Sequence, residues 1–277
     1  MISLVKKQVE KVWGKDILPY PFTVSGTASG TASGTGRIGE IWFEPPASMP
    51  SILVKYIFTS EKLSVQVHPN DAQALAFGET DQGKEECWLV LEAEPGATLG
   101  IGFREPLDNQ AMHKAACDGT IEALMEWYPV SRGDFFYIPA GTVHAIGAGV
   151  SLIEIQQNSD ITYRLYDYGR PRELHLDKGI AVAAGEPYNL QLRKNLENAG
   201  TVALAQGPYF WAWHIADKHA PAFLQDLAGP FLLVPLQGAV EVAGDHTPFG
   251  DCIVVNDLAS AAFSGACLVI TSTLNPA

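Results

Sequence analysis

The chain has few positive charges for its size. Its 277 residues include 18 lysines and arginines against 31 aspartates and glutamates, a formal net charge of −13 at pH 7. Such a protein is repelled by the phosphates of nucleic acids and by anionic membrane surfaces, so we expect neither as a partner. An anionic small molecule would need a locally positive pocket.

Cysteines and long apolar runs are also scarce. The four cysteines have no CxxC spacing, which favours reduced, buried thiols over a disulfide framework; they are Cys87, Cys117, Cys252 and Cys267. No apolar run approaches the roughly 20 residues of a membrane span, and the first 15 residues lack the apolar block of a secretory signal. We therefore expect a cytoplasmic protein.

Apolar material for a core is ample, at 47% hydrophobic against 18% charged residues, which indicates one large globular domain or two modest ones. A tract at 25–36 repeats TASG and predicts a flexible surface loop. A phosphate-binding loop is the disfavoured alternative, because the GxxxxGK[ST] pattern and a strand-to-helix context are missing. Residues 5–12 are expected to form a short helix with basic and acidic residues.

Strand patterns dominate the rest of the chain. We expect strands at 39–43, 52–58 and 63–68, through 85–103, and again from Asp134. Residues 105–127 have helical spacing with Asp118-Gly119 in the middle, which predicts two short helices joined by a turn. Asp71 is expected to cap a short helix through Phe77, another helix is expected within 174–186, and the pattern is all-β from Thr201.

The most informative stretch begins at Gly133. Five residues separate it from Pro139, and Gly141 and His144 follow. The run DFFYI is a short apolar strand, Pro139 and Gly141 form a tight turn, and the next strand carries His144 inward. This spacing resembles the second sequence motif of the cupin β-barrels, in which the histidine binds a metal. A buried histidine in an ordinary hairpin is the alternative.

A second cluster of candidate ligands lies in LSVQVHPND, residues 63–71. Alternation along a strand places Ser64, Gln66 and His68 on one face. The other face then carries Leu63, Val65 and Val67. Three polar residues facing one way are costly in a plain core, so this face is expected to line a wet or metal-bearing cavity.

Downstream, in GKEECWLVL, Glu86 begins a strand and Lys84 shares its parity. Solvated strand-end charges are the alternative reading of these two residues. Two imidazoles with two oxygens suit a borderline divalent ion such as zinc, one per chain, although another divalent ion also fits. The candidate ligands are Gln66, His68, Glu86 and His144.

Several motifs in one order resemble the type I mannose-6-phosphate isomerases (phosphomannose isomerases) of the short bacterial kind, in the cupin superfamily. They are VWGK at 12–15, GEIWF at 39–43, LSVQVHPND at 63–71, GKEECW at 83–88, GDFFYIPAGTVHAIG at 133–147, and the run from Glu154 through TYRLYDYGR. The resemblance covers residues 1–180 strongly and the remainder weakly.

It implies a mainly β fold, a cupin-type double-stranded β-helix (jelly-roll) with a small helical insertion near 105–127. We expect a catalytic metal-binding domain over 1–198 and a degenerate cupin-like β-domain over 199–277. In the latter, Gly250 and Asp251 echo Gly133 and Asp134, but no histidine follows at the right offset. His214, His219 and His246 fit no ligand spacing and are expected to be non-catalytic, and His113 is expected on a helix surface.

The reaction that the resemblance implies is the interconversion of mannose 6-phosphate and fructose 6-phosphate, through an enediol-type intermediate. Arg164 is permanently protonated and is assigned charge stabilisation and substrate orientation, with a salt bridge in a Tyr-rich loop as the alternative. Glu154 is the first candidate for the base and Lys84 the second. Glu154 can instead orient a metal ligand or Arg164. We expect Glu154 on a strand and Arg164 on the return loop.

The substrate is expected to contact Ser64 and Lys84 on the ligand face, and Trp13 and Glu40 at positions that match the family's pocket, although Trp13 fits core packing equally well. The competing functions are a non-catalytic sugar- or sugar-phosphate-binding module and an iron dioxygenase. The second is disfavoured because Gln66 replaces a nitrogen ligand. The oligomeric state stays open between monomer and homodimer.

Overall fold

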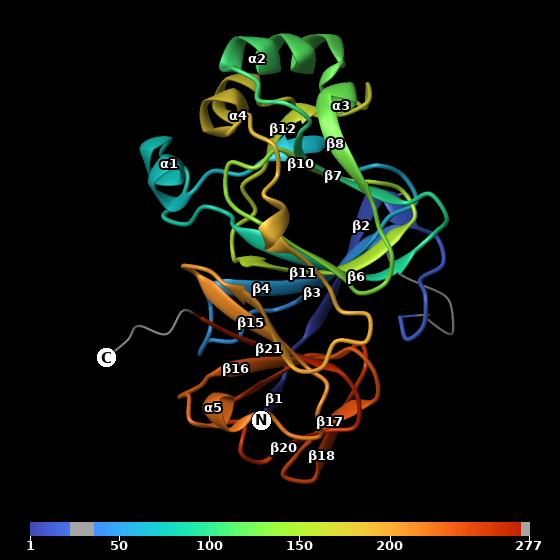
Figure 1. Cartoon of the computed structure of the whole chain (residues 1–277), viewed down its shortest axis with the longest axis vertical. Helices are drawn as coiled ribbons and strands as arrows, with labels where there is room; N and C mark the ends of the chain where they lie inside the picture. The colour runs from blue at the N-terminus through green and yellow to red at the C-terminus, as the bar shows by residue number, and fades with distance from the viewer. Residues whose placement is uncertain (23–35, 273–277) are drawn as a thin grey trace.

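The computed structural model describes residues 1–22 and 36–272 of the chain. Over these residues the chain is mainly β, and its four antiparallel sheets are stacked along the long axis of the molecule (Figure 1). Five α-helices and one 3-10 helix complete the described part; they are α1 (Asp71–Ala76), α2 (Asn109–Asp118), α3 (Ile121–Leu124), α4 (Leu176–Val182), η1 (Leu190–Leu192) and α5 (Ala222–Gln225).

Two facing sheets form what we call the N-terminal barrel. The five-stranded sheet contains β5 (Val65–Val67), β7 (Thr98–Phe103), β8 (Met125–Pro129), β10 (His144–Ile146) and β12 (Tyr163–Tyr166). The seven-stranded sheet contains β2 (Lys6–Lys15), β3 (Ile38–Phe43), β4 (Ile52–Phe58), β6 (Glu86–Ala93), β9 (Asp134–Ile138), β11 (Val150–Gln157) and β13 (Arg193–Asn195).

The C-terminal barrel follows the same plan. Its six-stranded sheet contains β1 (Ile2–Ser3), β14 (Val202–Gln206), β15 (Phe210–Ile215), β16 (Phe231–Pro235), β19 (Ile253–Val255) and β21 (Cys267–Ser272). The three-stranded sheet contains β17 (Ala239–Val242), β18 (Asp245–Pro248) and β20 (Ala261–Phe263). The two paired-sheet barrels confirm the predicted cupin-type class. Strand β1 pairs with β19, so the extreme N-terminus completes the C-terminal barrel.

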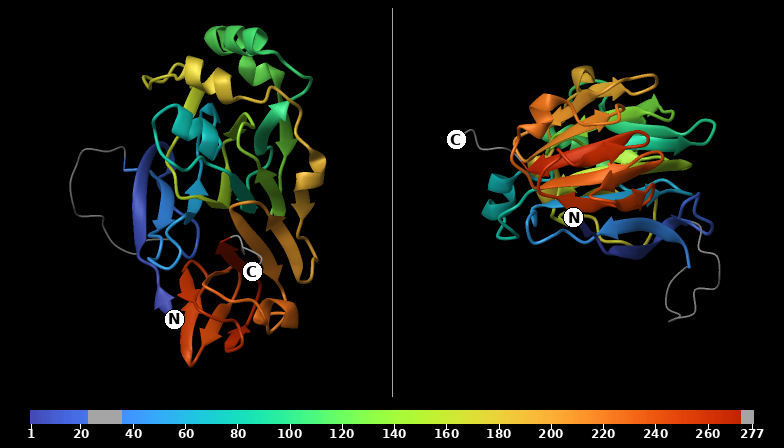
Figure 2. Two further views of the ribbon diagram at one scale, coloured as in Figure 1. Left: turned by 90° about the vertical axis from the view of Figure 1, so that its left-hand side faces the viewer. Right: turned by 90° about the horizontal axis from the view of Figure 1, so that it is seen from below.

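The strands of the seven-stranded sheet are apolar on both faces, because the sheet lies between two cores. Along β4, Val54, Tyr56 and Phe58 pack toward the six-stranded sheet, whereas Ile57 packs toward the five-stranded sheet. The opposite face of the five-stranded sheet is covered by α2 and α4 (Figures 1 and 2). A sheet buried on both sides positions its inward side chains rigidly, and these carry the site described below.

Most expected elements are present, with a few corrections. The expected helix at 5–12 is wrong: this segment is strand β2, which pairs with β3 from Lys6↔Phe43 onward, so long-range pairing overrides the local pattern. The cap of α1 is Asn70, not Asp71; its side chain accepts from the backbone N–H of Gln73. Helices α2 and α3 confirm the insertion, with Gly119 at φ 80° between them.

Two further expectations concern the thiols and the glycine-rich tract. Three cysteines are buried free thiols, but Cys117 is exposed on α2, which corrects that expectation for one of the four. The TASG tract at 25–36 lies almost entirely outside the described residues. Among the helices of the described residues, none has the length and hydropathy needed to cross a membrane.

Candidate metal centre and substrate cavity

Three side chains from the two facing sheets meet inside the N-terminal barrel. His68 follows β5 and His144 opens β10 in the five-stranded sheet, and Glu86 opens β6 in the seven-stranded sheet. One ligand atom from each lies within 4.8 Å of the others, and all three residues are buried. The sequence-predicted cluster is therefore brought together, and among the described residues it is the only such group of His, Cys, Asp and Glu.

Backbone carbonyl groups orient both imidazole rings. His68 Nδ1 lies 2.7 Å from the Ile161 carbonyl oxygen, and His144 Nδ1 lies 2.9 Å from that of Thr142. A carbonyl oxygen only accepts, so Nδ1 carries the proton and Nε2 keeps its lone pair. Burial lowers the pKa of both histidines, and Lys84 lowers that of His68 further. Both rings are therefore neutral at neutral pH, as metal ligation requires.

The carboxylate of Glu86 completes a donor set that fits a divalent metal ion. Its Oε1 and Oε2 lie 3.4 Å from His144 Nε2 and 3.6 Å from His68 Nε2. Neither oxygen receives a well-directed hydrogen bond from the described residues, although the Lys84 ammonium lies 2.6 Å from Oε2. Two nitrogen lone pairs and a buried carboxylate face one another here, and a cation bound between them would compensate this concentration of negative potential.

Gln66 lies at the same point, as expected. Its Nε2 is 3.2 Å from His144 Nε2, and its Oε1 accepts a hydrogen bond from Ser64 Oγ at 3.3 Å. A half-turn of the amide plane would present the oxygen to the histidine nitrogens. The expected alternation is confirmed for Val65 and Val67, which pack under α2 and α4. It is wrong for Leu63, which precedes β5 and packs inside the barrel.

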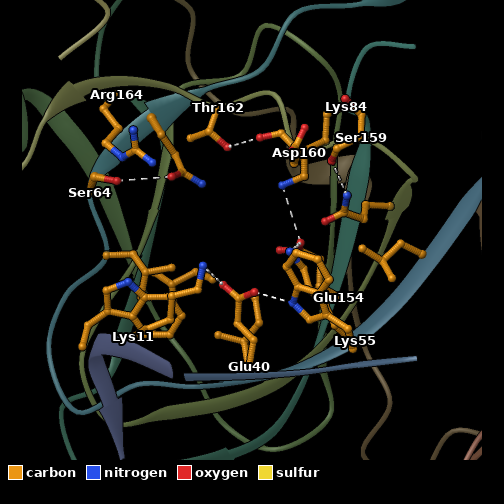
Figure 3. A pocket seen from close by; sticks show the side chains of 18 of the residues that line it. Lys11, Glu40, Lys55, Ser64, Lys84, Glu154, Ser159, Asp160, Thr162 and Arg164 are labelled. Atoms are coloured by element: carbon orange, nitrogen blue, oxygen red, sulfur yellow. Dashed lines mark hydrogen bonds and ion pairs between the residues drawn. The ribbon is translucent and has the colours of Figure 1, made fainter. Parts of the chain in front are cut away.

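A buried charge network lies beside the cluster, on the inner face of the seven-stranded sheet (Figure 3). Glu154 Oε1 is 2.7 Å from Lys55 Nζ and 3.6 Å from Lys84 Nζ, and Glu154 Oε2 accepts from Trp88 Nε1 at 2.9 Å. Burial by itself would raise the pKa of Glu154, but Lys55 and Lys84 outweigh it and lower the pKa to about 2. Glu154 is thus held as a carboxylate.

Cations outnumber carboxylates around the cavity next to the cluster, which has a volume of about 560 Å³. The five cations are Lys11, Lys55, Lys84, Arg164 and Arg172, and the three carboxylates are Glu40, Glu154 and Asp160. This volume lies within the usual range for small-ligand sites, about 300–1,000 Å³. The acidic chain therefore does contain a locally positive pocket that suits an anionic ligand.

Arg164 is the cation in this cavity that lacks an ion-pair partner among the described residues. It lies on strand β12, not on a return loop as expected, and its Nε is buried without a hydrogen bond. Asp167, its nearest candidate partner in sequence, instead binds Arg170 at 2.7 Å and Arg172 at 2.5 Å. The alternative salt bridge for Arg164 is thus not present in the described part of the chain.

The other expected contact residues also line the cavity. Trp13 is 3% exposed and packs in the barrel core, as expected for packing, and it also borders the cavity. Glu40 accepts from Trp42 Nε1 and lies 3.3 Å from Lys11 Nζ. Ser64 opens onto the cavity beside Arg164 (Figure 3).

Two buried polar residues of the site were not anticipated from the sequence. Lys55 is a lone cation within the apolar run ILVKYIF, and a buried lysine in a strand signals a paired charge. Gln156 shares the parity of Glu154 on β11, so alternation along EIQQ points it into the same cavity.

The curated proteins that this chain resembles in sequence are mannose-6-phosphate isomerases. A curated mannose-6-phosphate isomerase of Streptococcus mutans is 35% identical over 257 residues, covering 85% of this chain and 78% of the relative. The mannose-6-phosphate isomerase ManA of Bacillus subtilis is 42% identical over 195 residues, covering 66% of this chain and 60% of that protein. No family model matches the chain.

The fold is shared with solved isomerase structures. The crystal structure of the mannose 6-phosphate isomerase from Bacillus subtilis superposes with a TM-score of 0.75 at 21% identity, covering 97% of this chain and 98% of that one. A putative mannosephosphate isomerase from Archaeoglobus fulgidus gives a TM-score of 0.73 at 17% identity, covering 98% and 97%. The solved structures show the shared fold, and the curated relative from Streptococcus mutans shows that the chain belongs to the mannose-6-phosphate isomerase family.

Proposed function

We propose that the chain interconverts mannose 6-phosphate and fructose 6-phosphate in the cavity of the N-terminal barrel. The observation that carries the proposal is the His68, Glu86 and His144 cluster beside a cavity with surplus positive charge. An aldose–ketose isomerase must move a proton between adjacent carbons and stabilise charge on their oxygens. The site combines a candidate metal-ligand set, buried ammonium groups and a guanidinium that has no ion pair among the described residues, which suits both tasks.

We propose Gln66, His68, Glu86 and His144 as the ligands of one zinc ion, with another divalent metal as the alternative. Neutral imidazoles and a carboxylate are ligands that zinc prefers, and the cavity leaves room for substrate. When bound, the ion supplies Lewis-acid stabilisation of negative charge near the ligand cluster. Fixed Nδ1 hydrogen bonds to two carbonyl oxygens support this assignment, since metal-binding histidines are usually oriented in this way.

Among the chain's own groups, Arg164 is proposed to hold negative charge of the substrate, because its guanidinium has no ion pair among the described residues. Of the two candidates for the base, Lys84 is proposed to handle the proton and Glu154 to orient its neighbours. An efficient base has a pKa near the working pH, so the low pKa of Glu154 favours its orienting role. Glu154 then fixes Lys55 and Lys84, and Lys84 lies beside the ligand cluster, 3.2 Å from His68 Nε2.

Ser64, Lys84, Trp13 and Glu40 are proposed as substrate-contacting residues, since each borders the cavity. Trp13 offers an apolar ring face to a sugar. Glu40 is held by Lys11 and Trp42 and presents a fixed acceptor for hydroxyl groups.

Two proposals concern the chain as a whole. We propose residues 1–198 as the catalytic domain and 199–277 as a C-terminal β-domain without a metal site, to which β1 adds a strand. We also propose a cytoplasmic location, which the four free thiols favour.

A coupled assay on mannose 6-phosphate, with metal analysis of the same sample, tests the function. A chelator is expected to abolish turnover, and zinc is expected to restore it. A metal-loaded protein that binds the sugar phosphate without converting it would instead be a sugar-phosphate-binding module.

A further inference from the structure

Gln156 is a buried amide in the cavity wall to which the proposed chemistry assigns no task. It lies near the end of β11, opposite Glu86 on β6 and Leu53 on β4, and its side chain shares the inner face with Glu154. The residue is 1% exposed and borders the cavity. Most polar groups buried in this way have a hydrogen-bond partner, so an unpartnered one calls for an explanation.

The orientation of this amide is determined by its neighbours. Gln156 Nε2 donates to the carbonyl oxygens of Gln157 and Ser159, each at 2.7 Å. Carbonyl oxygens only accept, so the reversed amide would place oxygen against oxygen at both contacts. The two N–H groups are therefore used within the chain, and Oε1 is left as an acceptor of known position.

No donor among the described residues reaches Gln156 Oε1. The two nearby ammonium groups are engaged by carboxylates, Lys55 by Glu154 and Lys84 by Glu86. Leaving a buried acceptor unsatisfied is unfavourable. Because Gln156 borders the cavity, the donor that this oxygen lacks among the described residues is expected in the molecule that fills the cavity.

We propose that Gln156 Oε1 accepts a hydrogen bond from a hydroxyl group of the sugar, at carbon 3 or carbon 4, and selects for substrates that carry it. The inference rests on the proposed function. The oxygens at carbons 1 and 2 belong at the ligand cluster and the phosphate at the cationic wall. The hydroxyls between them are the remaining donors, and a preformed acceptor rejects an analogue that lacks its donor.

The test compares mannose 6-phosphate with its 3-deoxy and 4-deoxy analogues in the metal-loaded wild-type enzyme and in Gln156→Met. For the wild type, one analogue is expected to lose about 10- to 100-fold in kcat/KM, as for an unsatisfied buried acceptor. In Gln156→Met that ratio should fall to about twofold or less. A purely structural role would instead lower turnover of all three substrates by the same factor.

Gln157→Met is the matched control. Gln157 is equally buried, but its Oε1 accepts from the Glu85 N–H and its Nε2 donates to Asp71. This variant should leave the ratio between hydroxyl and deoxy substrates at its wild-type value, whatever it does to stability. Zinc content per chain should be unchanged in both variants.

Two results would contradict the proposed role of Gln156. Wild-type enzyme that converts both deoxy analogues as well as the parent sugar overturns it, even when Gln156→Met does not fold, and so does a ratio that Gln156→Met leaves unchanged. In those cases Oε1 binds only water. If metal-loaded wild-type enzyme fails to convert mannose 6-phosphate itself, the proposed function falls first and the role of Gln156 with it.

Discussion

In the N-terminal barrel the space between the facing sheets is apolar at one end and charged at the other, whereas the core between the C-terminal sheets is formed by apolar side chains. Along β11, Leu152 packs in the apolar end, and Glu154 and Gln156 border the cavity. On β15 of the C-terminal barrel, Trp213 and Ile215 point into the core, and His214 binds the Gly200 carbonyl oxygen away from it.

The difference shows how a small barrel bears buried charge. Glu154, Lys55, Lys84 and Glu86 are buried as paired groups, since isolated charges would lose too much hydration. At one end of the N-terminal barrel, charged and polar side chains replace the apolar packing, and this end holds the candidate site. The seven-stranded sheet of this barrel is buried on its other face against the C-terminal barrel, through residues such as Tyr56, Phe135 and Leu232. The apolar barrel therefore supports the charged one.

The largest expected effect distinguishes the histidines of the two barrels. Replacing His144 by Ala removes a proposed ligand and should lower kcat/KM by more than about 100-fold, since even changes behind a ligand cost 10- to 100-fold. Bound zinc, measured by elemental analysis, should fall in parallel. His246→Ala on β18, where the histidine is exposed, should change neither quantity beyond about twofold. Equal losses in both variants would contradict the separation of the barrels.

A second prediction breaks the charge network. Lys55→Met leaves Glu154 buried with only Lys84, at 3.6 Å, as a cationic partner, and should lower the free energy of unfolding by about 3 kcal/mol. The double variant Lys55→Met with Glu154→Gln removes both charges and should recover most of that loss. Urea unfolding monitored by tryptophan fluorescence measures both. A double variant no more stable than Lys55→Met would show that the pair is not coupled.

A third prediction targets the apolar barrel. Leu233 is fully buried in the C-terminal core, and Leu233→Ala should cost about 2–3 kcal/mol of stability through lost packing. The cavity and the ligand cluster do not involve this residue. Turnover per folded chain at 25 °C should therefore stay at the wild-type level, and a loss of kcat in fully folded protein would contradict a role limited to stability.

The smallest expected effect compares the Gly-Asp pairs that the two barrels share. Asp134 is buried and accepts hydrogen bonds from Ser131 N, Asn195 Nδ2 and Arg193, which outweigh the effect of burial and lower its pKa. Asp251 forms a half-exposed ion pair with Lys6. Asp134→Asn should cost about 1–2 kcal/mol at pH 7, and Asp251→Asn less than about 1 kcal/mol.

The stability difference between wild type and Asp134→Asn should depend on pH. A carboxyl with a lowered folded pKa stabilises the protein above its unfolded pKa of about 3.9, and the contribution is lost as the pH falls through the folded value. The gap between wild type and Asp134→Asn should thus be complete at pH 7 and shrink toward pH 3. Chemical unfolding at the two pH values measures it. A gap of constant size would assign the loss to packing alone.

The convergence of His68, Glu86 and His144 could be predicted because it depends on local rules. Strand parity puts Gln66 and His68 on one face, and the Gly133 to His144 spacing aims His144 inward. The helix expected at 5–12 failed because strand β2 is formed by pairing with β3, which lies across the undescribed tract in sequence. Arg164 was placed on a loop because nothing local reveals the pairing of β12 with β5.

The sequence alone determined the mainly β character and the faces of the strands from which Gln66, His68, Glu86 and His144 project, because side-chain alternation and turn chemistry act over a few residues. The cupin-type class was indicated by the resemblance of the motifs and their order. The tertiary structure alone decided which charges pair and how the layers stack. Glu154 is ionised because Lys55 of the neighbouring strand lies 2.7 Å away, and β1 completes the C-terminal barrel more than 200 residues from its partner β19. Parity specifies a face but not the strand that will oppose it, and that choice depends on burial summed over the whole chain.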